Sequence, residues 1–204
     1  MTVTISRLYD NHNEAQKAVK RLEAAGVPHS DISIVANNSD SWFSADKKVD
    51  RDRDGVDDRA EGAGKGAGIG AGVGGTAGLL AGLGLLAIPG LGPVVAAGWL
   101  AATAVGAAAG AATGGIVGAL TEAGVSTEEA HSYAEGVRRG GTLVSARVAD
   151  AARLEPLLDE SAINLRDRRA AWQKAGWKSF DAGSKPYGAE EVRKERALYG
   201  GGLR

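Results

Sequence analysis

Acidic side chains recur at short intervals between residues 50 and 61, and their spacing is typical of a metal-binding loop. Counted from Asp50, oxygen ligands fall at positions one, three, five, nine and twelve, with Gly55 at position six. Calcium-binding loops share this pattern, because carboxylates alternate around a sharp turn and a final glutamate binds through both oxygens. The candidate calcium ligands are Asp50, Asp52, Asp54, the backbone carbonyl of Val56, Asp58 and Glu61.

A second interpretation of this acidic segment stays open. Position eight is Asp57, where calcium loops that work in pairs usually carry an apolar residue, and residues 39–49 lack the pattern of an entering helix. The segment is then a solvated linker, whose last carboxylates favour the start of the next helix through its dipole. If calcium does bind, the ion would fix the angle between the parts of the chain on either side.

The remaining chemistry-bearing residues do not form a catalytic pattern. The three histidines, His12, His29 and His131, are too dispersed to form a ligand pair, and the serines do not fit a nucleophile motif. Lys65-Gly66-Ala67 lacks the hydroxyl residue of a phosphate-binding loop. The net charge is −1 and cysteine is absent, which excludes a disulfide framework and gives no nucleic-acid signature. We therefore expect no enzyme, no small-molecule substrate and no nucleic-acid partner.

Glycine recurs at every fourth residue through the middle of the chain, which places it on one face of a helix. Glycine costs about 1 kcal/mol per helix position relative to alanine, so such helices need close backbone packing against a neighbour. The pattern predicts a glycine-zipper helical hairpin over residues 62–121. Its helix-packing residues are Gly62, Gly66, Gly70, Gly74, Gly78, Gly82, Gly98, Gly106, Gly110, Gly114 and Gly118.

Two environments would satisfy this hairpin. Residues 66–88 and 94–120 each reach the roughly 20 apolar residues that span a bilayer, and no charge interrupts them. Glycine and alanine are only weakly hydrophobic, however, so the two helices can instead pack on each other or join copies of the chain into oligomers or filaments. We expect a homo-oligomer with a lipid membrane as a further partner, in the cytoplasm or at the inner face of the cytoplasmic membrane.

The flanking segments predict an α+β fold. Residues 3–8 and 32–36 alternate as strands around a helix that Gly26 ends, and residues 142–148 and 163–165 do so around a helix capped by Asp150. This order is a ferredoxin-like split βαβ sandwich that carries the hairpin as an insertion. The predicted parts are residues 1–38 and 122–167 for the two halves of the α/β domain, 39–61 for the acidic linker, 62–121 for the hairpin and 168–204 for the tail.

Several blocks of the chain resemble a known family. They are Val27-Pro28 leading into Asp31-Ile32-Ser33-Ile34-Val35, residues 77–84, residues 88–98, and residues 133–144 from Tyr133 to Val144. Together they are similar to bacterial general stress proteins of the heat-induced YflT type, over about residues 2 to 180. The resemblance implies a non-enzymatic bacterial protein linked to stress, with no catalytic residues.

The C-terminal tail combines aromatic and charged residues. Trp172 and Trp177 are the candidate tail anchors, which either hold the tail against its own domain, sit at a lipid interface or bind a neighbouring subunit. Residues 190–198 predict a short helix. Arginines at positions 138, 139, 166, 168 and 169 either contact anionic headgroups or form a face balanced by nearby acids.

Overall fold

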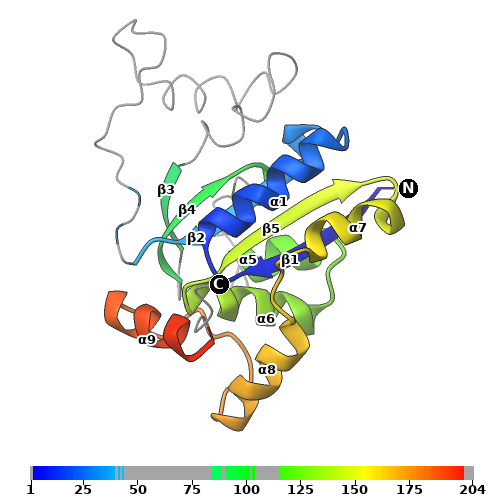
Figure 1. Ribbon diagram of the computed structural model, residues 1–204. Helices are drawn as coiled ribbons and strands as arrows, with labels where there is room; N and C mark the ends of the chain where they lie inside the picture. The colour runs from blue at the N-terminus through cyan, green and yellow to red at the C-terminus, as the bar shows by residue number, and fades with distance from the viewer. Residues whose placement is uncertain are drawn as a thin grey trace, which may run out of the picture.

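A computed structural model of the chain describes residues 2–39, 41, 43, 84–88, 91–101, 103 and 115–199. Its centre is an antiparallel five-stranded sheet in the order β1-β5-β2-β4-β3 (Figure 1). The strands are β1 (Val3–Tyr9), β2 (Ile32–Asn37), β3 (Gly84–Ile88), β4 (Gly92–Ala97) and β5 (Thr142–Val148). The α+β class predicted from the sequence is confirmed.

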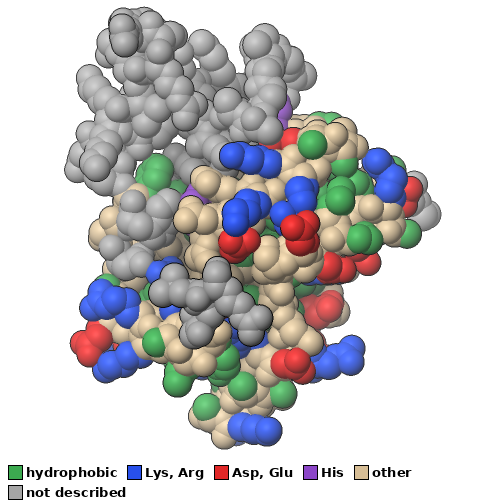
Figure 2. Space-filling model, viewed as in Figure 1, with side chains coloured by type: hydrophobic (Ala, Val, Ile, Leu, Met, Phe, Trp, Pro, Cys, Tyr) green, Lys and Arg blue, Asp and Glu red, His purple; other side chains and the backbone are tan. Residues whose placement is uncertain are grey.

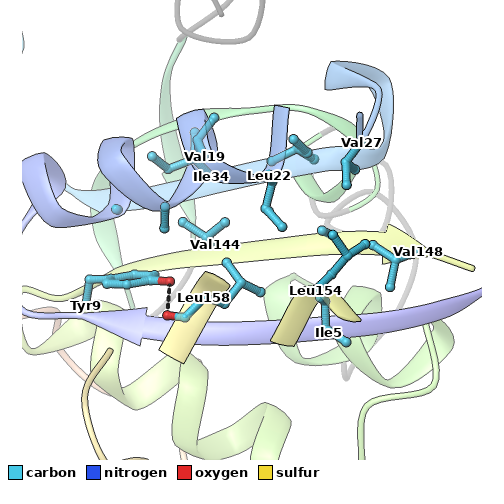
Figure 3. Close-up of a cluster of buried hydrophobic side chains, with 14 of the residues drawn as sticks. Ile5, Tyr9, Val19, Leu22, Val27, Ile34, Val144, Val148, Leu154 and Leu158 are labelled. Carbon is cyan, nitrogen blue, oxygen red and sulfur yellow. Dashed lines mark hydrogen bonds between the residues drawn. The ribbon is translucent and has the colours of Figure 1, made fainter. Parts of the chain in front are cut away.

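Helices α1 (His12–Ala24) and α7 (Ala151–Asp159) cover one face of the sheet. Asn11 caps α1 by accepting a hydrogen bond from the backbone N–H of Glu14, and Leu22 lies at helical spacing among its buried residues. Figure 3 shows side chains of the two helices, such as Leu22 and Leu158, packing with those of the strands beneath them, such as Val144 on β5. At one end of this core the hydroxyl of Tyr9 donates to the carbonyl of Leu158 over 2.7 Å.

The opposite face is covered by α5 (Ile116–Glu122) and α6 (Thr127–Arg138), which pack on each other as well as on the sheet. Its second hydrophobic core includes Leu8 and Leu143 from the strands and Leu120 from α5. Two further helices, α8 (Leu165–Lys174) and α9 (Ala189–Tyr199), follow α7, and a short 3-10 turn, η1 (His29–Asp31), precedes β2. The helix predicted over residues 190–198 is confirmed as α9, one residue longer at each end.

The prediction of one helical hairpin over residues 62–121 is wrong for residues 84–88 and 92–97, which form the strands β3 and β4. β4 pairs with β2 from Ile34↔Ala97 to Asn37↔Val94, and β3 pairs with β4 on its other side. Glycines at 84 and 92 each cost a helix about 1 kcal/mol, and sheet pairing recovers the backbone hydrogen bonds that a helix would have supplied. Tertiary pairing therefore overrides the apolar run that suggested helices.

The last predicted strand, residues 163–165, is also wrong. Ile163 donates one backbone hydrogen bond of 2.8 Å to the carbonyl of Leu8 at the outer side of β1, and α8 then begins at Leu165. Asn164 favours the helix because its side chain accepts from the backbone N–H of Asp167 as an N-cap. Strands β1, β5 and β2 therefore lie side by side in the sheet, and residues 163–165 add no fourth strand beside β1.

None of the helices among the described residues combines the length and the apolar character that crossing a bilayer requires. On the face formed by α1 and α7, basic and acidic side chains lie interspersed rather than in separate fields (Figure 2). Several of them form ion pairs, such as Lys17 with Glu14 at 2.8 Å. Exposed pairs of this kind contribute at most about 1 kcal/mol each.

Candidate functional site

The most strongly organised polar site in the described part of the chain surrounds Glu135, whose carboxylate is fully buried on α6. Arg138 and Arg139 both donate to it, from one helical turn further along. The spacings of three and four residues place all three side chains on one face of the helix. A buried carboxylate requires such partners, because an unpaired charge in the interior costs several kcal/mol.

The C-terminal segment attaches to this buried ion pair. Arg139 also contacts Glu195 of α9 at 3.2 Å, and the same carboxylate accepts the indole N–H of Trp172 at 2.9 Å. Arg196 donates twice to the carbonyl of Gly140, at 3.1 and 2.8 Å. We call Glu135, Arg138, Arg139, Trp172, Tyr187, Glu195 and Arg196 the tail-docking cluster.

Aromatic rings cover the two arginines of this cluster. Arg138 lies 4.6 Å from the ring centre of Tyr187, and Arg139 lies 5.1 Å from that of Trp172 and 5.4 Å from that of Tyr187. Burial by itself would lower the pKa of Arg139, but its hydrogen bond to Glu135 and the charges of Glu135 and Glu195 raise the pKa above its usual value. The guanidinium therefore keeps its charge, which suits both the carboxylates and the faces of the rings.

Gly140 explains why α9 packs so closely here. Its φ of +106° lies in the left-handed region, and an added Cβ would come within 2.5 Å of Val192 on α9. Val192 is fully buried in return. The turn after α6 thus provides both the carbonyl that binds Arg196 and the hollow that accepts an α9 side chain.

The two tail anchors predicted from the sequence have different environments. Trp172 is 1 % exposed and belongs to the second hydrophobic core, whereas Trp177 is partly buried against that core. Their rings meet edge to face with centres 5.8 Å apart. Only the indole N–H of Trp172 has an acceptor, since that of Trp177 is buried without a partner.

A polar groove of about 830 Å³ lies between the starts of α6 and α8. Basic and acidic groups face each other across it, for example Arg169 and Glu128 at 2.8 Å. Tyr133 donates to the carbonyl of Ser6 at 2.6 Å, and burial raises its pKa to about 12, so its hydroxyl stays protonated at neutral pH. Arg7 and Asp159, which also line the groove, form a second ion pair there.

The predicted calcium ligands, Asp50, Asp52, Asp54, Val56, Asp58 and Glu61, lie outside the described residues. Within the residues that are described, no group of three or more histidine, aspartate or glutamate side chains is arranged to hold a metal ion. The calcium prediction therefore stays a prediction.

Most of the glycine ladder, from Gly62 to Gly82 and from Gly106 to Gly114, also lies outside the described residues. Gly118 lies on α5 as a helical residue. Gly98 does not belong to a helix face, because it follows β4 with a φ of +88° and an added Cβ would come within 2.2 Å of the carbonyl of Ile32. Its role as a zipper residue is wrong, and its small size serves contact with β2.

The basic residues considered as a surface for anionic headgroups are largely paired with acids. Arg168 contacts Asp10 at 3.0 Å and Arg169 contacts Glu128, in addition to the two arginines bound to Glu135. The spacing of Glu135, Arg138 and Arg139 is visible in the sequence and could have indicated their pairing. Nothing in the sequence pattern indicated Tyr187 or Glu195 as their partners, because those contacts depend on where the tail folds back.

Comparison with known proteins gives one match. No curated protein and no solved structure matches the chain significantly. Residues 4–84 match the family model described as "Heat induced stress protein YflT domain". The matched range contains β1, α1 and β2 and extends to Gly84 at the start of β3, and the similar blocks at residues 88–98 and 133–144 lie beyond it. Over residues 4–84 the chain is therefore similar to the heat-induced stress protein YflT domain, as the sequence predicted.

Proposed function

We propose that this chain is a non-enzymatic bacterial stress-response protein, whose α/β domain presents a glycine-rich segment that joins copies of the chain. The observation that carries the proposal is the family match, because its residues 4–84 include the glycines from Gly62 to Gly82. This part of the glycine ladder therefore lies within the residues that are similar to the heat-induced stress domain.

The sheet supports self-association over insertion of a hairpin. Residues 84–88 and 94–97 belong to the two stretches that were long enough to span a bilayer, but they form parts of the strands β3 and β4. Residues 104–114, between the described parts of the second stretch, are fewer than the roughly 20 that a spanning helix needs. Leu100 and Ile116, on either side of them, are both buried in the same core. The alternative proposal is that the same glycine-rich segment lies on the surface of a membrane.

A helix face made of glycine gains stability only from close packing against a neighbour. The proposal therefore predicts that larger side chains on this face will disrupt assembly. Leucine at Gly70 and Gly74 would hold two backbones apart while raising hydrophobicity. Leucine at Gly72 and Thr76 adds the same side chain about 200° further around a helix, on the opposite face. The second pair is the matched control for the first.

The test is the oligomeric state of the full chain, measured by sedimentation velocity with and without detergent. We expect a defined assembly of the unmodified protein in buffer, which the Gly70→Leu, Gly74→Leu double variant loses and the Gly72→Leu, Thr76→Leu control keeps. A monomer that does not change with concentration would refute self-association. An unmodified protein that floats with vesicles, and does so at least as well after the first pair of substitutions, would favour the membrane surface instead.

A further inference from the structure

Arg147 on β5 differs from the other half-buried arginines in the described part of the chain. Each of those has an acceptor for its guanidinium, either a carboxylate or a backbone carbonyl. The carboxylate-bound ones are Arg7, Arg138, Arg139, Arg168 and Arg169, and the carbonyl-bound ones are Arg21 and Arg196. Arg147 has neither among the described residues, and its Nε is buried without a partner.

Trp99 lies against this guanidinium. The centre of its ring is 4.4 Å from the Cζ of Arg147, which is cation-π geometry. The indole N–H of Trp99 is also buried without an acceptor. Two buried N–H donors without acceptors, one of them on a cation, thus belong to neighbouring side chains, although each unsatisfied donor costs about 1–3 kcal/mol.

Arg147 lies at the end of a row of polar residues that crosses three strands of the sheet. Ser6, Ser145 and Ser33 stand opposite one another across β1, β5 and β2, and their hydroxyls have partners. Arg147 follows Ser145 on the same face of β5, since residues two apart share a face. Its pair across the strands is Thr4 on β1, a further hydroxyl side chain at the same level.

The position of Trp99 is fixed by its neighbours. Gly98 turns the chain at a φ of +88° directly against Ile32 and Ser33, at a distance that excludes a side chain. The backbone N–H of Leu100 then donates to the hydroxyl of Ser33 over 2.8 Å. Trp99 is therefore held between two anchored residues, so its ring is placed over Arg147 before any ligand binds.

We infer that Arg147 and Trp99 form a binding site for an oxyanion, a phosphate or carboxylate group, carried either by a free small molecule or by a lipid headgroup. A guanidinium presents N–H donors in a fork that matches such groups. The indole N–H supplies a further donor, and the ring holds the guanidinium in place. The inference does not depend on the proposed self-association, because Arg147 lies on β5 and Trp99 closely follows β4.

Binding of inorganic phosphate and of acetate to the full chain, at constant ionic strength, tests the site. Titration calorimetry and tryptophan emission both report it. Arg147→Gln removes the charge, and Trp99→Phe keeps the ring but removes the N–H. The matched control is Arg153→Gln, since Arg153 is an exposed arginine on α7 that donates to the carbonyl of Ala25.

We expect saturable binding of at least one of the two anions by the unmodified protein. The dissociation constant should rise about tenfold in Arg147→Gln, which corresponds to about 1.4 kcal/mol. It should rise several-fold in Trp99→Phe and stay unchanged in the control. Absence of saturable binding by the unmodified protein would overturn the inference. So would folded Trp99→Phe and Arg147→Gln variants that bind the anion with the same affinity as the unmodified protein.

Flotation with phosphatidylglycerol vesicles distinguishes the two sources of the anion. Flotation that Arg147→Gln weakens and that saturating inorganic phosphate suppresses identifies a lipid headgroup. Saturable binding of phosphate or acetate without flotation identifies a free molecule. Flotation that neither the substitution nor phosphate changes, together with no anion binding in solution, would contradict the site.

Discussion

The indole N–H of Trp172 on α8 donates a hydrogen bond of 2.9 Å to the carboxylate of Glu195 on α9. That carboxylate also contacts Arg139, which in turn contacts the buried Glu135 of α6. Three helices that are far apart in the sequence are thus joined by one continuous set of charge-assisted hydrogen bonds. Loss of these hydrogen bonds should therefore lower the stability of the whole domain and not only that of the tail.

Replacing Trp172 by phenylalanine keeps an aromatic ring in the core but removes the donor to Glu195. Hydrogen bonds to charged groups contribute about 1.5–3 kcal/mol, and we expect a loss of that size in the free energy of unfolding measured by urea denaturation. Trp177→Phe is the matched control, because the indole N–H of Trp177 is buried without an acceptor. A loss in the control as large as in Trp172→Phe would contradict the assigned role of the hydrogen bond.

Glu135→Ala should be among the most destabilising single substitutions in the chain. It leaves the guanidinium groups of Arg138 and Arg139 without their buried partner, which typically costs about 3–5 kcal/mol. The comparison is Glu190→Ala, which breaks an exposed pair with Lys194 on α9 and should cost less than about 1 kcal/mol. Chemical denaturation of both variants gives the difference, and similar losses in the two would show that the buried cluster contributes little.

Two glycines separate the effect of backbone conformation from that of close packing. Gly98 and Gly124 have φ values of +88° and +90°, but an added Cβ meets Ile32 at 2.2 Å only at Gly98, while Gly124 has open space. Alanine at Gly124 should cost about 1–2 kcal/mol for the left-handed backbone alone. Alanine at Gly98 should cost clearly more, as thermal unfolding of the two variants will show. Equal costs would mean that β2 moves away without penalty.

His12 predicts a specific dependence of stability on pH. Burial lowers its pKa in the folded protein to about 4, below the value of about 6.5 in the unfolded chain. The folded state therefore binds the proton less readily, so this contribution is present above pH 6.5 and is lost as the pH falls from 6.5 towards 4. The difference in unfolding free energy between the unmodified protein and His12→Gln should follow this window. A difference that does not vary between pH 7 and pH 4 would contradict it.

The local elements of the α/β domain were predictable because each depends on residues close in sequence. Asn11, Ser126 and Asp150 cap their helices through side-chain contacts three residues ahead, and these are visible as patterns. Strands β1, β2 and β5 likewise show the expected alternation or short apolar runs. The family resemblance was also visible in the sequence, since the blocks at residues 27–35 and 77–84 lie within the matched range.

The strands β3 and β4 could not be predicted in this way. Their short apolar runs fit a buried helix as well as a strand, and the choice depends on β2 offering an edge for Val94 and Ala97 to pair with. The tail-docking cluster and the pair of Arg147 with Trp99 were missed for the same reason. Their members are brought together by folding of segments that lie far apart in the chain.

Asn37 stands opposite Val94 in the sheet although residues 38–93 intervene. The ends of the intervening segment are thus held together by the sheet whatever its length. The entropy cost of closing a flexible segment grows only by about 0.6 kcal/mol for each doubling. Relatives could therefore lengthen or shorten the stretch between β2 and β3 at little cost to the pairing of β2 with β4.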